Sequence, residues 1–423
     1  MITQPNSRLL CCLSILVLLP LLSGTASAGE EQIIDGVTHI VNSATPSQGL
    51  QTMQLEELWR VGGEASDMFF GLITQVRHDE AGNIYLLDSQ LSEVQVYSPA
   101  GDHLQTLFRE GEGPGEIRQA RDLIMMPDGA VGAVMEYPAK VIQVDRDNNP
   151  VGELTVGADD LDSGGSESLI CGDSGGGSIV LTGAHATRGE DPGISERINF
   201  LSRYGSDGAE EVRYLESHSQ YNFNDFVFTE LHHMPNFWWC WDVGPDGRVY
   251  ATPYQDRYEI HVFLPDGTPD RVIEREYQSR PRTSEEYDRF EAMVENAMSG
   301  MGIPVTVEVE KNDPDVAQIE RGIRVRDDGT LWVLHSHGMR DQPDGIMLTF
   351  DVFDPAGHYL KQVAVACDAD PAHDGIFFTG GGRAVVVKEY IAAMAAQFGR
   401  GSTLSEEGVE AQAMEVICFR IVE

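Results

Sequence analysis

Positive charge is scarce in this sequence. Its 423 residues include 68 Asp and Glu but only 29 Lys and Arg, which gives a formal net charge of −39. A chain this acidic repels a phosphate backbone, and no run of basic residues forms a compensating patch. Nucleic acid is therefore not an expected partner. Only four of the basic residues are lysines, namely Lys140, Lys311, Lys361 and Lys388.

Long apolar runs are lacking after residue 28. Residues 1–28 have a polar start with Arg8, an apolar stretch from Leu9 to Leu22 and small residues ending at Ala28, which is typical of a cleaved export signal. The stretch is shorter than the roughly 20 apolar residues that span a bilayer. We therefore expect cleavage after Ala28, a periplasmic or extracellular product, and no transmembrane segment in the mature chain.

Cysteine is also sparse, with six in the whole sequence. An exported protein can form disulfides, and a bridge between Cys171 and Cys240 is conceivable because both fall on innermost strands of neighbouring repeats. Four buried free thiols are the alternative, because a domain of this size needs no disulfide for stability. The sequence leaves the pairing open for the four cysteines after the leader: Cys171, Cys240, Cys367 and Cys418.

Turn residues, in contrast, are abundant, with 44 Gly and 20 Pro. One pattern recurs: a strand, a tight glycine turn, a β-branched or aromatic strand, an alternating strand, a second turn and a closing strand. Four-stranded sheets repeated in this way predict an all-β fold, a six-bladed β-propeller. The first turn glycine of each copy is Gly82, Gly129, Gly177, Gly247, Gly329 and Gly382.

The sixth copy has no fourth strand of its own. Because Met53–Val61 precedes the first copy without a hairpin partner, we expect this N-terminal strand to pair with Ala413–Val422 and to close the last blade. The predicted domain plan is a signal peptide at 1–28, a linker at 29–51 and a propeller at 52–423. A helical insertion is expected at about 278–318, where Thr283 and Glu286 form a possible capping box.

Several stretches of the first two copies resemble a known family. The linker "GEGPGEI" (Gly111–Ile117), the following "ARDLIMMPDG" and the preceding "GNIYLLDSQLSEVQVYSPAGDHL" are similar to NHL repeats and related six-bladed propellers of exported bacterial proteins. That family includes protein-binding scaffolds, sugar-lactone hydrolases and an amidating lyase. The resemblance implies that Asp88 caps a turn at a strand end, a position taken by His335 in the fifth copy and Lys388 in the sixth.

The longer connections are all expected on one rim of the propeller, which makes this rim the predicted functional surface. Histidine is frequent there. His232 and His233 are adjacent and should point to opposite sides, whereas His335 and His337 alternate on one extended segment and could jointly bind an ion. Arg340 follows in the same loop. Loops hold polar residues in general, so this clustering alone does not establish a site.

A further group of candidates lies at the entry ends of the innermost strands, which should line the channel mouth. Carboxylates and arginines there could hold Ca²⁺ or a polar ligand, or could neutralise one another in salt bridges. Trp238 is expected on a strand, either packed in the core or used as a stacking platform. The candidates are Arg121, Asp122, Trp238, Glu320, Arg321, His373 and Asp374.

Two functions compete at this stage. The first is a binding or scaffold module for a protein, peptide or glycan, acting through the loop-rich rim. The alternative is a hydrolase or lyase with a metal at the channel mouth, carried by His335, His337 and His373. No cofactor is expected apart from Ca²⁺ or Zn²⁺ in the second case.

Overall fold

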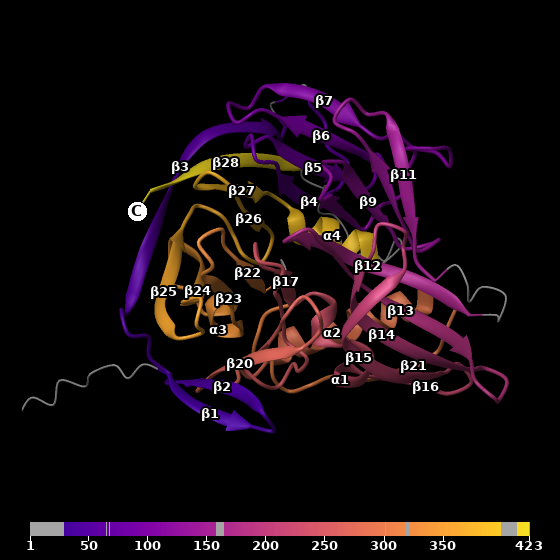
Figure 1. Cartoon of the computed structure of the whole chain (residues 1–423), viewed down its shortest axis with the longest axis vertical. Helices are drawn as coiled ribbons and strands as arrows, with labels where there is room; N and C mark the ends of the chain where they lie inside the picture. Colours follow the sequence, from indigo (N-terminus) through magenta and orange to yellow (C-terminus); the bar gives the residue numbers. More distant parts are fainter. Residues whose placement is uncertain are drawn as a thin grey trace, which may run out of the picture.

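The structure is a computed structural model that describes residues 29–64, 66, 68–157, 165–300, 302–318, 322–398 and 413–422. Most of these residues form β-strands, and the sheets lie side by side around the molecule (Figure 1). The predicted all-β class is confirmed. The predicted signal peptide, residues 1–28, lies outside the described residues.

Three sheets consist of four consecutive strands each. In β5 all five side chains are buried, because the strand is covered by neighbouring sheets on both faces. The turn glycines Gly82 (φ +78°) and Gly129 (φ +90°) have the left-handed conformation that tight turns require. The strands are β4 (Ile73–His78), β5 (Ile84–Asp88), β6 (Glu93–Tyr97), β7 (His103–Leu107), β8 (Asp122–Met125), β9 (Val131–Met135), β10 (Lys140–Val144), β11 (Pro150–Thr155), β12 (Ser166–Gly175), β13 (Ser178–Arg188), β14 (Ile194–Tyr204) and β15 (Glu210–Asn222).

The fourth unit is extended at its outer edge by an N-terminal hairpin. Its β2 pairs in parallel with β20, so the sheet has six strands. The hairpin lies in the segment expected to be a linker. Its turn, Asp35 (φ +50°) and Gly36 (φ +84°), has the positive angles that Asp-Gly favours in two-residue hairpins. The strands are β1 (Glu30–Ile34), β2 (Val37–Asn42), β17 (Trp241–Val243), β18 (Val249–Ala251), β19 (Glu259–Phe263) and β20 (Pro269–Arg275).

The last two units are joined by β3 into one eight-stranded sheet. Residues Gln54–Gly62 of β3 pair antiparallel with β28, which confirms the predicted pairing of the N-terminal strand with the end of the chain. Met53 itself pairs with Val365, because the first part of β3 runs parallel to β25. The strands are β3 (Leu50–Gly62), β22 (Ile323–Val325), β23 (Leu331–Leu334), β24 (Ile346–Phe353), β25 (Tyr359–Ala366), β26 (Gly375–Thr379), β27 (Arg383–Val387) and β28 (Glu415–Val422).

Apolar side chains fill the spaces between successive units. One cluster joins the first unit to the last, where Ile73 and Leu86 pack with Val385 and Val416. The hydrogen-bonded ladder does not run continuously around the molecule, however. Closure of six blades into one ring therefore stays a prediction.

The two long connections on either side of the fourth unit combine into a small module. The module contains β16 (Phe226–Thr229) paired in parallel with β21 (Val305–Glu308), together with α1 (Glu230–His233) and α2 (Ser284–Gly300). The predicted capping box begins α2: the Glu286 amide donates to the Thr283 hydroxyl (3.2 Å) and the Thr283 amide donates to the Glu286 carboxylate (2.8 Å). Among the described helices, none combines the length and the apolar character needed to cross a membrane.

Arginine–carboxylate pairs hold this module together. Arg282 bonds Glu230 with both of its terminal nitrogens (2.6 and 2.8 Å), and both side chains are almost fully buried. Arg280 extends the network to Asp313 (2.8 Å) and to Asp341, which lies beside α3 (Ser336–Arg340). Three long connections are therefore in mutual contact, as expected if they share one rim.

Buried aspartates connect the innermost strands of neighbouring units. Asp122 on β8 accepts hydrogen bonds from the Gly172 amide on β12 (3.0 Å) and from Arg77 on β4 (3.0 Å). Asp242 on β17 similarly accepts from the Val325 amide on β22 (2.7 Å). A buried carboxylate is costly unless such donors satisfy it, so these contacts fix the spacing of the innermost strands.

The four cysteines after the leader are free thiols. The Cys171 thiol donates to the Trp238 carbonyl (3.1 Å) and the Cys240 thiol to the Ala317 carbonyl (3.2 Å). The bridge between them that the sequence permits is therefore not formed.

The substitution Asp122→Ala should lower the free energy of unfolding by about 3 kcal/mol, because the largely buried Arg77 loses its nearest carboxylate and keeps only Asp173, at 4.0 Å, as an ionic partner among the described residues. Chemical denaturation measures this loss. The matched control is Glu112→Gln, which removes an exposed carboxylate paired with Arg118 and should cost less than about 1 kcal/mol. Equal losses in both variants would contradict the role of Asp122.

Candidate functional site

His232 and His233 lie together in α1 and have different environments. His232 is exposed, while His233 is buried and packs against Tyr221, Phe226 and Phe228. The Thr229 amide donates to its Nδ1 atom (3.0 Å), and burial lowers the pKa of His233. His233 therefore belongs to the core of the module.

The expectation that Trp238 lies on a strand is wrong. Pro235 precedes a 3-10 turn, η2 (Asn236–Trp238), in which the Trp238 amide donates to the Pro235 carbonyl (3.1 Å), and the innermost strand begins only at Trp241. Trp238 is buried, with the Arg197 guanidinium 5.0 Å from its ring centroid. Its side chain packs in the core and offers no open stacking surface.

The expectation that His335 and His337 share one extended segment is also wrong. The strand β23 ends before His335 and α3 begins at Ser336, so the two residues do not alternate along one strand, although both rings pack against Tyr277. His335 is buried and its Nδ1 atom accepts from the Gly338 amide (3.2 Å). His337 is partly exposed and bonds Asp341 (2.7 Å) and the Gln278 carbonyl (3.0 Å).

His335 forms part of a buried polar cluster between the fourth and fifth units. Its Nε2 atom lies 3.5 Å from Asp351, a fully buried carboxylate that also accepts from Tyr258 (2.7 Å). Arg275 pairs with the same carboxylate and is surrounded by three tyrosine rings at 5.1–5.2 Å. Burial lowers the pKa of His335 to about 4, so this ring is neutral near pH 7.

Asp315 is a second buried group beside this cluster, in the connection that enters the fifth unit. It is 3% exposed, and its Oδ1 atom has no hydrogen-bond partner among the described residues. Burial raises the pKa of Asp315 to about 6, although a hydrogen bond from Ser279 opposes the shift.

The candidates at the predicted channel mouth have different partners in the structure. Arg121 pairs with Glu136 (2.7 Å) rather than with Asp122, whose carboxylate is used by Arg77 and backbone amides. Glu320 and Arg321 lie outside the described residues. His373 and Asp374 lie at the entry of the sixth unit.

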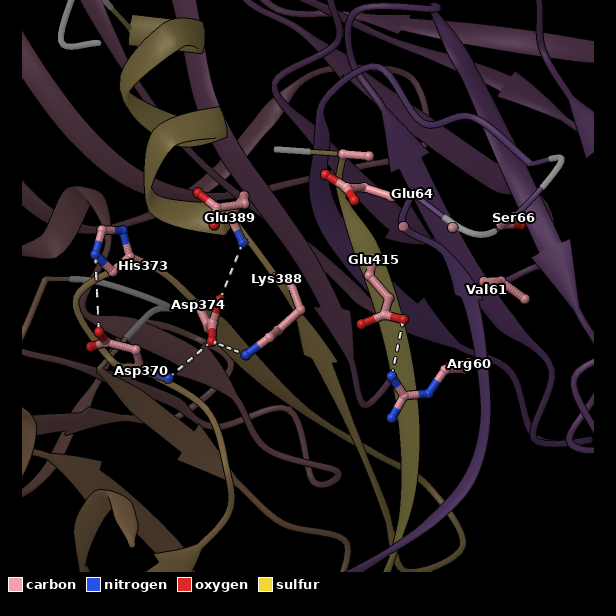
Figure 2. Close-up of a pocket in the computed structure, with 13 residues that line it drawn as sticks. Arg60, Val61, Glu64, Ser66, Asp370, His373, Asp374, Lys388, Glu389 and Glu415 are labelled. Atoms are coloured by element: carbon pink, nitrogen blue, oxygen red, sulfur yellow. Dashed lines mark hydrogen bonds and ion pairs between the residues drawn. The ribbon is translucent and has the colours of Figure 1, made fainter. Parts of the chain in front are cut away.

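His373 and Asp374 line a hollow of about 700 Å³, which we call the first hollow (Figure 2). Four chain segments converge on it: the end of β3, the connection into β26, the end of β27, and the start of β28. Residues more than 300 positions apart in sequence therefore share one cavity because β3 pairs with β28.

An ion pair between a partly exposed lysine and a buried aspartate forms one side of this cavity. The Lys388 ammonium lies 2.6 Å from Asp374, and Asp374, which is 4% exposed, also accepts from the amides of Asp370 (2.9 Å) and Glu389 (3.2 Å). On the opposite side Arg60 pairs with Glu415 (3.1 Å). Figure 2 shows the Lys388 and Glu389 nitrogens directed at Asp374.

Lys388 occupies the strand-ending position that Asp88 has in the first unit. Asp88 accepts hydrogen bonds from the amides of Gly71 (2.6 Å), Leu72 (3.0 Å) and Leu91 (3.0 Å), as the family resemblance implies for a turn cap. In the sixth unit the strand end carries a cation instead, and the entry loop supplies the carboxylate Asp374 that pairs with it. The position departs from the turn cap of the first unit and lies beside an open cavity, so it is a candidate for function.

Glu389 adds backbone strain at the same place. Its φ is +62°, in the left-handed region that residues other than glycine seldom adopt. Such conformations are concentrated at functional sites. Its carboxylate, together with that of Glu64, forms no ion pair with a Lys or Arg of the described chain, and both residues line the first hollow.

The sequence analysis missed Arg60, Glu64, Lys388 and Glu389 as site residues. The available signal was Lys388, one of four lysines in an acidic chain, at a strand end where the repeat has Asp.

Arg340 lies exposed at the end of α3, at the margin of a second cavity. Over the described part of the chain, no three His, Cys, Asp or Glu side chains are grouped so that they could hold a metal ion.

No protein-family model and no curated protein matches this chain. Similar solved structures include a Bacteroides fragilis protein that its name describes as exported (TM-score 0.47, 11% identity, covering 88% of this chain and 100% of that one). Virginiamycin B lyase from Staphylococcus aureus (0.39, 12%, 80% and 82%) and the calcium-binding protein regucalcin from Agrobacterium tumefaciens (0.40, 10%, 87% and 94%) are also similar. Likeness at these values carries no argument about activity.

The substitutions Asp315→Asn and His335→Gln should change the pH dependence of stability in opposite directions. From about pH 4 to 6, native Asp315 binds more protons than unfolded Asp, so its contribution to stability falls as pH rises. Native His335 binds fewer protons than unfolded His over about pH 4 to 6.5, so its contribution rises. Each pKa shift corresponds to a change of about 3 kcal/mol in the free energy of unfolding across its pH range, at about 1.4 kcal/mol per pKa unit.

Urea denaturation of both variants across this pH range tests the expectation. Relative to the wild type, Asp315→Asn should gain stability with increasing pH and His335→Gln should lose it. His218→Gln, at an exposed histidine, is the control and should parallel the wild type. Three parallel curves would show that neither buried group titrates as stated.

Proposed function

We propose that this chain is an exported binding module and that the first hollow is its ligand site. The observation that carries the proposal is the convergence of four separate chain segments on one charged cavity of about 700 Å³. Concave sites with a few convergent polar groups are the usual form of ligand sites. The ion pair of Lys388 and Asp374 and the strained backbone of Glu389 lie in the same cavity.

The charges of the first hollow favour a ligand with a cationic group. Two of its carboxylates, Glu415 and Asp374, are matched by Arg60 and Lys388. The carboxylates of Glu64, Asp370 and Glu389 have no Lys or Arg partner in the described chain. An amine or guanidinium of a ligand would complete these pairs, and such groups occur on lysine and arginine side chains.

A protein or peptide segment fits this site better than a glycan. No Phe, Tyr or Trp is among the described residues that line the first hollow, so an apolar face of a ligand has no apolar ring to stack on. Recognition would rest on charge, and the affinity should fall as salt increases.

The finer features of the fold belong to the same proposal. We infer that the six four-stranded units close as one NHL-like propeller, and the pairing of β3 with β28 supports this inference. Export is inferred from the leader-like residues 1–28. A metal-dependent hydrolase or lyase using Ca²⁺ or Zn²⁺ remains the alternative, and stoichiometric metal in the purified mature chain would favour it.

The site can be tested by calorimetry with N-acetyl-lysinamide, using N-acetyl-glutaminamide as the neutral probe. The lysine probe should bind with a Kd of about 1 mM, equivalent to about 4 kcal/mol, and the neutral probe should bind more weakly. Glu389→Gln should weaken binding of the lysine probe by about five-fold, because one carboxylate partner is lost.

Two results would contradict the proposed site. One is equal binding of the charged and neutral probes, and the other is an unchanged affinity in both Glu389→Gln and Glu64→Gln. The matched control is Glu112→Gln, which neutralises an exposed carboxylate outside the cavity and should leave the affinity unchanged.

A further inference from the structure

A second hollow lies directly beside the first. It has a volume of about 410 Å³ and is lined by the loop after α3 and by the connection into the sixth unit. Asp370 and Lys388 line both hollows. The two cavities therefore meet at these residues and are two compartments of one surface depression.

Lys388 is suited to contact a ligand at this boundary. Its side chain is 31% exposed, and its ammonium has three donor hydrogens. The ion pair with Asp374 uses one of these donors. The remaining donors can reach acceptor groups, such as peptide carbonyls, of a chain that passes from one hollow into the other.

The charge balance differs between the two hollows. The first has five carboxylates against two basic side chains, Arg60 and Lys388. The second has three carboxylates against Arg340 and Lys388. Arg340 is exposed and forms no hydrogen bond or ion pair with the described residues, although its charge acts on the Glu286 carboxylate. An anionic group of a ligand can therefore pair with its guanidinium.

We propose that the two hollows form one bipartite site for an extended peptide segment. This inference extends the proposed function and rests on it. The segment carries a basic side chain, which enters the first hollow between Glu64 and Glu389. An acidic side chain a few residues away pairs with Arg340 in the second hollow. Lys388 binds the intervening backbone, and the spacing of the two charged residues determines the affinity.

The test uses N-acetylated, C-amidated peptides that contain one Lys and one Glu separated by an increasing number of glycines. Each added residue lengthens an extended peptide by about 3.4 Å, so one spacing should match the distance between the compartments. At that spacing the affinity should exceed that of N-acetyl-lysinamide by at least about ten-fold, because the second contact becomes intramolecular.

Variants at exposed positions distinguish the contributions of the two compartments and leave the ion pair of Lys388 and Asp374 in place. Arg340→Gln should abolish the ten-fold gain and leave the binding of N-acetyl-lysinamide unchanged. Glu64→Gln should weaken both probes by a similar factor. Peptides with two lysines should show no gain in the wild type, because Arg340 repels the second lysine. Arg118→Gln, at an exposed arginine outside the site, is the matched control.

The outcomes distinguish this inference from the proposed function. If N-acetyl-lysinamide binds but the affinity of the longer peptides is independent of spacing and of Arg340, the bipartite site is wrong and the single-compartment function stands. If neither the lysine probe nor the peptides bind, both are overturned.

Discussion

The pairing of β3 with β28 is the interaction on which the candidate site depends. It places the end of an N-terminal strand against the last strand of the chain and brings the first and last units into one apolar cluster. Without it, the last unit would keep an unpaired edge, which proteins usually cover. The first hollow would also lose the wall that contains Arg60 and Glu64.

One position of the repeat shows how a scaffold acquires a site. At the end of the second strand, Asp88 caps backbone amides in the first unit, and His335 does the same for the Gly338 amide in the fifth. In both units a side chain at the strand end accepts hydrogen bonds from backbone amides of residues nearby in the sequence. In the sixth unit Lys388 pairs with a carboxylate from another segment, Asp374. This ion pair places opposite charges beside an open cavity.

The sequence predicts the features that depend on local patterns. The turn glycines, the capping box of α2 and the unpaired N-terminal strand are each visible within a few residues, and the structure agrees with them. Trp238 and His337 were misplaced because short turns of helix begin next to them, which strand alternation does not reveal. The first hollow was not predicted because its walls meet only through pairing between distant segments.

The position of β3 also affects the order in which the protein can be completed during synthesis. This strand is made before all six units, yet its antiparallel partner β28 is the last described strand, so β3 must remain unpaired on that side until residues 415–422 have been made. The first hollow can exist only in a chain that includes β28. A chain that stops before β28 would lack one wall of the first hollow, so this cavity cannot form early in synthesis.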